Sequence, residues 1–237
     1  MKKIKIALYF LTMIIYSLLF FATMWWVLIL PKRYARIICN VVPFSYLNIV
    51  DVLFGFERRV IGVENKPDYP VIYAVKHQST YETFWSAWEL KNSFYVIKKQ
   101  LLYIPIIGLY FWRAGMIAID RSKGRDAIKK MLKDAKVRID NGGILTIFPE
   151  GTRTAIGEKR EYKQGVYIMA TELNMPVVPV AVNTGLYWKK GMWNGKSGRV
   201  TMEYLPEISA VGKTKEQFLK ELQTAMEKAS DNLAKNP

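Results

Sequence analysis

The only histidine of the chain, His77, stands five positions before Glu82 in the segment Lys76-His77-Gln78-Ser79-Thr80-Tyr81-Glu82. Imidazole is the side chain that exchanges protons most readily near neutral pH. A carboxylate on one ring nitrogen fixes the tautomer, leaves the other nitrogen free to act as a base and stabilises the imidazolium that forms. The two residues therefore predict a His–Glu pair that performs general acid–base catalysis.

The spacing also permits a structural interpretation. Five residues along a continuous helix turn through about 500°, so His77 and Glu82 meet only if His77 precedes the helix and Glu82 lies in its first turn. Ser79 as N-cap would place Glu82 at the third helical position, where its carboxylate bonds back to the Ser79 N–H in a capping box. The two interpretations are compatible, and both remain open.

The nucleophile is expected to come from the substrate. The sequence has no Gly-x-Ser-x-Gly elbow, and its one cysteine, Cys39, lies in an apolar N-terminal segment. A hydroxyl on the substrate is therefore the expected nucleophile. With one histidine and one cysteine, a soft-ligand metal site is nearly excluded, and we expect no metal and no other cofactor.

A second cluster of polar residues is Phe148-Pro149-Glu150-Gly151-Thr152-Arg153-Thr154, directly after a predicted strand at 144–148. Pro149 and Gly151 favour a sharp turn, and a glycine lets the backbone approach a ligand closely. Thr152 offers a hydroxyl, and Arg153 offers a planar fork suited to phosphate. The alternative is an ordinary turn with a surface Arg–Glu pair.

Two further basic residues follow predicted strands. Arg121 ends the run Gly115-Met116-Ile117-Ala118-Ile119-Asp120-Arg121, and Lys98 begins Lys98-Lys99-Gln100-Leu101. The carboxyl ends of strands are where α/β folds usually place their sites. A structural salt bridge is the alternative for the Asp120–Arg121 pair.

Short apolar runs that alternate with helical patterns predict the elements that must position these residues. Val-, Ile- and Phe-rich runs of about five residues are typical of buried strands, and here they cover residues 71–75, 94–97, 116–119, 144–148 and 177–182. An amphipathic helix is expected at 125–141, ending at Gly142, and another after a capping box formed by Thr214 and Gln217. The pattern predicts an α/β domain at 58–237 with a largely parallel or mixed sheet flanked by helices.

The first 57 residues are predicted to anchor the chain to a membrane. Residues 6–30 lack any charged side chain, and as a helix they would reach roughly 37 Å, enough to cross a hydrocarbon core of about 30 Å. The segment is too long for a secretory signal, and Trp25 and Trp26 suit the headgroup level. Residues 37–56 are apolar but interrupted, which predicts an interfacial helix and a helical hairpin; a single crossing of the bilayer remains open.

The charge balance favours anionic partners. The chain carries 35 Lys and Arg against 20 Asp and Glu, a net charge of +15. Nucleic acid, an acidic protein or an anionic membrane would each suit this surface. The single cysteine excludes an intrachain disulfide.

Taken together, these segments resemble the glycerolipid acyltransferase family, and within it the PlsC-like 1-acyl-sn-glycerol-3-phosphate acyltransferases. The resemblance runs from about Val71 to Gly185. Residues 77–82 are similar to the family's His-x-x-x-x-Asp motif, and 148–153 match its Phe-Pro-Glu-Gly-Thr-Arg motif. Residues 115–121 and 177–181 resemble its second and fourth blocks.

The resemblance implies a reaction and roles for the residues. His77 would take the proton from the sn-2 hydroxyl of lysophosphatidic acid as it attacks an acyl thioester, giving phosphatidic acid, and Glu82 would orient His77. Substrate binding would fall to Lys98, Arg121, Glu150, Gly151, Thr152 and Arg153. The co-substrate would be acyl-CoA or acyl carrier protein, and the enzyme would work on a membrane, at the cytoplasmic face of a bacterial inner membrane.

Two positions depart from the family's pattern. Glu82 stands where the family usually has Asp, and Lys76 stands where Asn commonly precedes the histidine. A related acyltransferase that uses glycerol-3-phosphate, another lysophospholipid or lipid A therefore stays open as an alternative. A more remote alternative is a non-catalytic basic module that binds a membrane, although the sequence lacks the interleaved aromatic and basic residues of a nucleic-acid platform.

Overall fold

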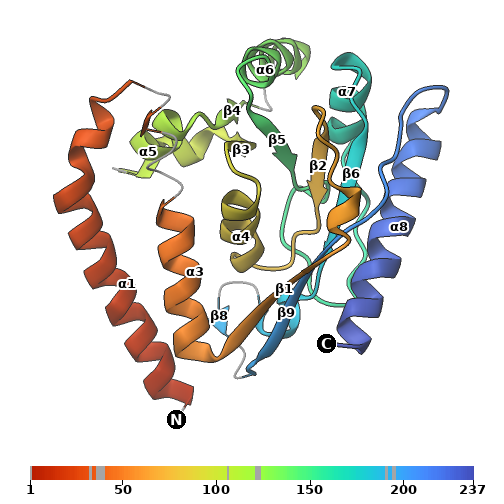
Figure 1. Cartoon of the computed structure of the whole chain (residues 1–237). Helices are drawn as coiled ribbons and strands as arrows, with labels where there is room; N and C mark the ends of the chain where they lie inside the picture. Colours follow the sequence, from red (N-terminus) through yellow and green to blue (C-terminus); the bar gives the residue numbers. More distant parts are fainter. Residues whose placement is uncertain are drawn as a thin grey trace.

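The computed structural model describes residues 2–31, 34–35, 41–105, 107–120, 124–189, 192–193 and 196–237. A helical hairpin at the N-terminus leads into an α/β domain built on a seven-stranded sheet (Figure 1). The strand order is β1-β9-β6-β2-β5-β3-β4. The strands are β1 (Phe56–Ile61), β2 (Ile72–Val75), β3 (Ser93–Lys98), β4 (Ile117–Ile119), β5 (Ile144–Ile147), β6 (Val177–Val182) and β9 (Gly198–Tyr204).

Most neighbouring strands are parallel. The pairs β2–β5, β2–β6, β3–β5, β3–β4 and β1–β9 run in the same direction, and β6–β9 is antiparallel. The predicted parallel or mixed sheet is thus confirmed, and all five predicted apolar runs form strands. Because the carboxyl ends of β2, β5, β3 and β4 lie at one edge, the polar segments that follow these strands are brought to the same side of the domain.

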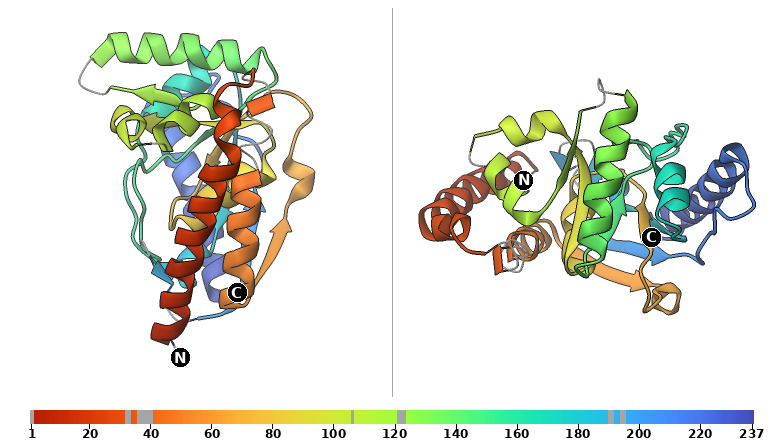
Figure 2. Two further views of the ribbon diagram at one scale, coloured as in Figure 1. Left: turned by 90° about the vertical axis from the view of Figure 1, so that its left-hand side faces the viewer. Right: turned by 90° about the horizontal axis from the view of Figure 1, so that it is seen from above.

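Helices cover both faces of the sheet, and β2 shows how its side chains divide between them. Tyr73 and Val75 join a buried cluster that includes residues of α3 (Val41–Phe54) and α4 (Tyr81–Glu89). Ile72 and Ala74 join a second cluster, with α6 (Gly124–Ile139), α7 (Gly165–Glu172) and α8 (Lys215–Lys235). Side chains alternate between faces along a strand, and Figure 2 shows α3 and α8 on opposite sides of the molecule.

The two helices expected from amphipathic patterns both form. Met131 and Ala135 on α6 are buried, and the chain leaves that helix through Gly142 at φ +73°. The α8 helix begins at the predicted capping box, in which the Thr214 side chain accepts from the Gln217 N–H and Gln217 bonds back. The C-terminal end of α6 and the N-terminal end of α8 are therefore both set by local capping interactions.

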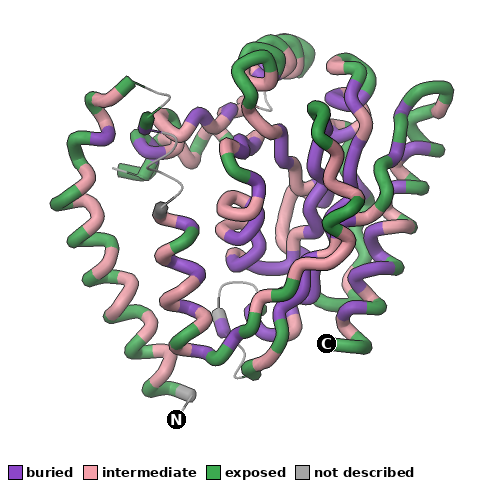
Figure 3. The backbone as a smooth tube through the Cα atoms, viewed as in Figure 1, coloured by how far each residue is buried: buried purple, intermediate pink, exposed green. Residues whose placement is uncertain are grey.

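The N-terminal hairpin consists of α1 (Lys2–Met24), which continues as the 3-10 helix η1 (Trp25–Leu28), and of α3, which runs back beside α1 (Figures 1 and 2). Residues 3–28 are helical and long and apolar enough to cross a membrane, with a mean hydropathy of 2.1 and an 18-residue apolar stretch of which nothing is buried inside the molecule. Its surface is mostly exposed or half-buried, in contrast to the buried strands (Figure 3). A buried core helix is therefore not the explanation for its apolar sequence.

The second helix of the hairpin rests on the helix that carries Glu82. The rings of Tyr46 on α3 and Phe84 on α4 stack with their centroids 4.1 Å apart. The Tyr81 hydroxyl, at the first residue of α4, donates to Oδ1 of Asp51 on α3 at 2.6 Å. The hairpin and the α/β domain thus share one apolar core. The domain boundary at residue 57 stays a prediction, although β1 begins at Phe56.

The apolar pattern of the sequence does not predict two strands of the sheet, β1 and β9. Each places charged or polar residues among its apolar ones: β1 reads FERRVI and β9 reads GRVTMEY. They form the β1–β9 side of the sheet, where only part of each strand is buried. A two-stranded ribbon, β7 (Trp188–Lys189) with β8 (Met192–Trp193), was also not predicted.

Candidate active site

Three adjacent strands bring the candidate site together. β2 leads to His77, and its neighbours β5 and β6 lead to Phe148 and to Thr184. Since these three strands are mutually parallel, their following loops meet at one edge of the sheet. The segments that resemble the family's motifs at residues 77–82 and 148–153, and the residues just after the one at 177–181, therefore lie close together at this edge.

The His77 ring contacts the Glu82 carboxylate directly, with Nδ1 2.8 Å from Oε1. Glu82 is fully buried, whereas the His77 side chain is 17% exposed. Because an ionised carboxylate only accepts hydrogen bonds, the network assigns the proton to Nδ1 and leaves a lone pair on Nε2. This tautomer is the one that a general base requires.

Glu82 is held by four further donors. Its Oε1 accepts from the N–H groups of Gln78 at 2.7 Å and Ser79 at 2.6 Å. Its Oε2 accepts from the hydroxyls of Ser79 and of Thr184, the latter at 2.6 Å. Hydrogen bonds to both of its oxygens fix the orientation of this carboxylate.

The pairing with His77 is present, and the predicted capping box is present only in part. Glu82 bonds back to the Ser79 N–H, as a capping box requires. The helix begins one residue later than expected, however, with Thr80 at the N-cap position, and the Ser79 hydroxyl accepts from the Tyr81 N–H. The same carboxylate therefore closes the start of α4 and orients the imidazole.

Phe148 stacks on one face of the imidazole, with ring centroids 4.1 Å apart and planes inclined by 22°. Tyr95, from β3, stacks in turn on Phe148 at 5.6 Å. Burial raises the pKa of Tyr95, whose hydroxyl lies 2.7 Å from the Ser86 hydroxyl. This stack fixes the plane of the His77 ring.

The loop at 148–154 holds the main chain of His77 on both sides. The Thr154 N–H and hydroxyl both donate to the His77 carbonyl, at 2.8 and 3.1 Å. The His77 N–H donates to Oε1 of Glu150 at 3.2 Å. Gly151 makes the turn between them at φ +67°, in the left-handed region that favours glycine.

Glu150 faces the interior of the protein. The residue is 1% exposed, and its Oε1 also lies 3.1 Å from the Lys76 ammonium. Burial raises the pKa of Glu150, and Lys76 opposes that shift. This carboxylate therefore supports the loop and the His77 main chain from the interior.

The other residues predicted to bind substrate are distributed more widely. Arg153 is half-buried and donates from Nη1 to the Thr80 hydroxyl at 3.0 Å, which brings its guanidinium to the start of α4. Gly151 and Thr152 are half-buried beside it. Lys98 is exposed at the end of β3, two strands away from β2, and Arg121 lies outside the described residues.

Thr184 and Gln78 belong to this network, and the sequence did not indicate them. Thr184 is 1% exposed, and the Gln78 side-chain oxygen accepts from the Gly185 N–H at 2.9 Å. One signal was available for Thr184. It follows the buried β6 run closely, and this is the kind of position from which the other site residues were inferred.

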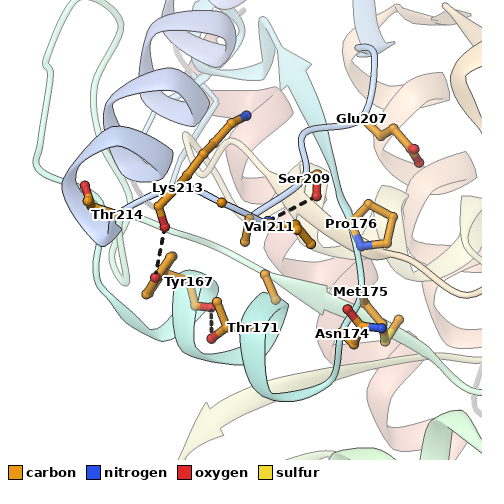
Figure 4. A pocket seen from close by; sticks show the side chains of 13 residues that line it. Tyr167, Thr171, Asn174, Met175, Pro176, Glu207, Ser209, Val211, Lys213 and Thr214 are labelled. Atoms are coloured by element: carbon orange, nitrogen blue, oxygen red, sulfur yellow. Dashed lines mark hydrogen bonds between the residues drawn. The ribbon is translucent and has the colours of Figure 1, made fainter.

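A separate pocket of about 650 Å³ lies between α7 and the segment that leads into α8 (Figure 4). None of its lining residues belongs to the His77, Phe148 or Thr184 segments. Across the residues that the structure describes, no group of three or more His, Cys, Asp or Glu side chains is arranged to hold a metal ion.

An imidazole oriented by a buried carboxylate, at the strand ends of an α/β sheet, is an arrangement suited to an enzyme that removes a proton from a hydroxyl group. The Acyltransferase family model matches residues 57–183, which include His77, Glu82 and the loop at 148–154. The chain belongs to this family and is an acyltransferase.

Individual relatives agree with the family assignment. A 1-acyl-sn-glycerol-3-phosphate acyltransferase from Pseudomonas aeruginosa is 34% identical over 186 residues, which cover 78% of this chain and 72% of the relative. One from Limnanthes alba is 31% identical, over 77% of this chain and 66% of the relative. The crystal structure of the 1-acyl-sn-glycerophosphate acyltransferase PlsC from Thermotoga maritima superposes with a TM-score of 0.78 at 20% identity and covers 98% of both chains, which shows the shared fold.

Proposed function

We propose that the enzyme transfers an acyl chain from a thioester to the sn-2 hydroxyl of lysophosphatidic acid, giving phosphatidic acid for phospholipid synthesis. The relatives named above carry the proposal for the acceptor. The observation that carries the proposal for the chemistry is the 2.8 Å contact between Nδ1 of His77 and the buried Glu82.

The reaction needs one base and no protein nucleophile. Nε2 of His77 takes the proton of the acceptor hydroxyl while its oxygen forms a bond to the thioester carbonyl carbon. The tetrahedral intermediate then expels the thiolate, which recovers the proton from the imidazolium. Glu82 holds the ring and offsets its positive charge, and positioned acid–base catalysis of this kind contributes about 10²–10⁴ in rate.

Arg153 is our first candidate for binding the acceptor's phosphate, supported by its position at the start of α4. A guanidinium presents parallel N–H donors that match a phosphate better than an ammonium does. Arg121 and Lys98 would add positive charge, as the resemblance to the family implies. Gly151 and Thr152 would line the path between the phosphate and His77.

The donor is proposed to be acyl-CoA or acyl carrier protein. Both are anionic, which suits a chain of net charge +15. The exposed apolar α1 associates the enzyme with the membrane in which the acceptor is dissolved. We place the enzyme at the cytoplasmic face of a bacterial inner membrane, where such donors are available.

The test uses purified protein in lipid, labelled lysophosphatidic acid and a panel of acyl thioesters, with the product identified by mass. Wild-type protein should form phosphatidic acid, and His77→Ala should lose turnover by about 10²-fold or more while remaining folded and membrane-bound. Retained turnover in His77→Ala would remove the imidazole from the mechanism. Turnover only with glycerol-3-phosphate, another lysophospholipid or lipid A would overturn the proposed acceptor.

A further inference from the structure

Lys76 is a buried charged residue that has no role in the reaction described above. Its side chain is 2% exposed, although it directly precedes His77. An isolated ammonium is strongly disfavoured in a protein interior, so its partners must compensate for the lost hydration. The identity of those partners indicates what Lys76 does.

Lys76 and His77 send their side chains to opposite faces of the sheet. The Lys76 N–H donates to the Val180 carbonyl at 2.9 Å, so the pairing of β2 with β6 continues through this residue. Alternation along the strand then places Lys76 on the same face as Ile72 and Ala74, toward α8. His77 falls on the opposite face, toward α4, where it meets Glu82.

On its face, the Lys76 ammonium joins two carboxylates. Its Nζ lies 2.6 Å from Oε1 of Glu227 on α8 and 3.1 Å from Oε1 of Glu150. Both carboxylates are buried, and the Tyr162 hydroxyl donates to Oε1 of Glu227 at 3.2 Å. The Glu150 oxygen that contacts Lys76 is also the one that accepts the His77 N–H.

We propose that Glu227 and Lys76 are positioning residues, through which α8 holds the Glu150 carboxylate that anchors the main chain of His77. The chain of contacts is Glu227 to Lys76, Lys76 to Glu150, and Glu150 to the His77 N–H. Its first member lies outside the part of the chain that the family model matches, residues 57–183. The inference rests on the proposed function in that His77 is taken to be the base.

The charges around Glu150 explain why the ammonium is needed. Facing Glu150 are Lys76 at the end of β2, Tyr162 from the segment before α7, and the His77 N–H. Glu227 from α8 contacts Lys76 and Tyr162. Burial already raises the pKa of Glu150, and Lys76 is the largest influence that opposes the rise. Without Lys76, the carboxyl would take up a proton at higher pH. A neutral carboxyl accepts the His77 N–H more weakly than an ionised one does.

The first arm of the test compares pH profiles of kcat/KM for wild type and Lys76→Met. Wild-type turnover is measured first, so that a failure of the proposed reaction is seen separately. We expect the acid limb of the Lys76→Met profile to move to higher pH by about one unit or more, with activity recovering in alkali. A loss by the same factor at every pH would mean that Lys76 only stabilises the fold, and would overturn the proposal.

The second arm varies Glu227 and keeps Lys76. Glu227→Leu removes the acceptor and should lower kcat by about three- to tenfold with KM unchanged, whereas Glu227→Gln keeps an acceptor oxygen and should retain most of the rate. The matched control is Asp231→Asn, one turn further along α8, whose ion pair with Lys159 is largely exposed. Wild-type kinetics in Glu227→Leu would show that α8 takes no part in positioning His77.

A third arm needs no substrate and therefore does not depend on the proposed reaction. His77 is the only histidine, so the protein gives one imidazole Cε1–H signal by NMR. Because the ring stacks on Phe148, this signal is sensitive to small displacements. It should shift in Lys76→Met and Glu227→Leu and stay in place in Asp231→Asn. An unchanged signal in both of the first two variants would overturn the proposal.

Discussion

The Thr184 hydroxyl lies 2.6 Å from Oε2 of Glu82, across 102 residues of sequence. Thr184 follows β6, and Glu82 lies in the first turn of α4 after β2, so the contact depends on the pairing of these two strands. The buried carboxylate that orients His77 is thus held from two separate loops. The fourth sequence block, residues 177–181, thereby contributes to the site through Thr184, which lies shortly after its end.

The first prediction concerns Thr184. Thr184→Val keeps the shape of the side chain and removes its hydroxyl, leaving the Ser79 hydroxyl as the donor that Oε2 retains in this network. We expect kcat to fall by about tenfold, since a hydrogen bond to a charged group contributes about 1.5–3 kcal/mol. The KM values for the acceptor and for the acyl thioester should change little. Thr184→Ser should restore most of the rate. If Thr184→Val has the same steady-state kinetics as wild type, the other hydrogen bonds to Glu82 are enough to position its carboxylate.

The second prediction concerns the length of the Glu82 side chain. Glu82→Asp introduces the residue that the family usually has, but it withdraws the carboxylate by about 1.5 Å, the length of one carbon–carbon bond. The donors from Gln78, Ser79 and Thr184 are placed around the longer side chain. We therefore expect kcat to fall by about 10²-fold, measured with saturating donor and acceptor. Full activity in Glu82→Asp would show that the loop adjusts to either carboxylate.

The third prediction separates the two substrates. Arg153→Ala should raise the KM for lysophosphatidic acid by about tenfold or more and leave the KM for the acyl thioester unchanged, because a charge-assisted contact to phosphate is lost. Arg153→Lys should give an intermediate value. Arg160→Ala is the control, since Arg160 pairs with Glu158 at the surface. Equal effects on both KM values would argue against a phosphate-binding role for Arg153.

The fourth prediction concerns the pH dependence of stability. Burial raises the pKa of Glu150 above its ordinary value of 4.5, so the folded protein holds this proton more tightly than the unfolded chain does. The stabilisation from this group is therefore complete when the pH is below the ordinary pKa, and it is lost as the pH rises through the pKa of Glu150 in the folded protein. Glu150→Gln has no proton to release at this position. The free energy of unfolding of Glu150→Gln, relative to wild type, should consequently rise as the pH increases above the ordinary pKa of 4.5.

Unfolding in detergent at a series of pH values measures this difference. The absolute stability of Glu150→Gln is not the relevant quantity, because the substitution also changes the contact with Lys76. A difference that stays constant with pH, or that moves in favour of wild type, would contradict the prediction.

The buried strands and the residues that follow them were predictable because their apolar runs are continuous. β6 was predicted with the bounds that the structure has, and β2 and β5 lie within the predicted runs, so the positions of His77 and Phe148 followed. β1 and β9 were not predicted, because their charged and polar residues conceal the pattern. The parallel β1–β9 pair also joins residues about 140 apart, a separation that leaves no local signal.

In the candidate site, too, local contacts were predictable from the sequence and long-range contacts were not. The sequence indicated that His77 and Glu82 could meet, because five residues across a capped first turn is a local geometry. The hydroxyl of Thr184 and the ammonium of Lys76 depend on contacts across the sheet and with α8. Lys76 stood out only as an unusual residue beside the histidine, and its burial could not be inferred from its charge.

The stacking of Phe148 on His77 restricts how an alcohol can reach the base. One face of the imidazole is covered by the phenyl ring, and the Nδ1 side is taken up by Glu82. The Nε2 lone pair lies in the plane of the ring and points away from that side. The acceptor hydroxyl must therefore arrive edge-on, which limits the directions from which its glycerol backbone can enter. A single line of approach of this kind favours one orientation of the bound acceptor over the others.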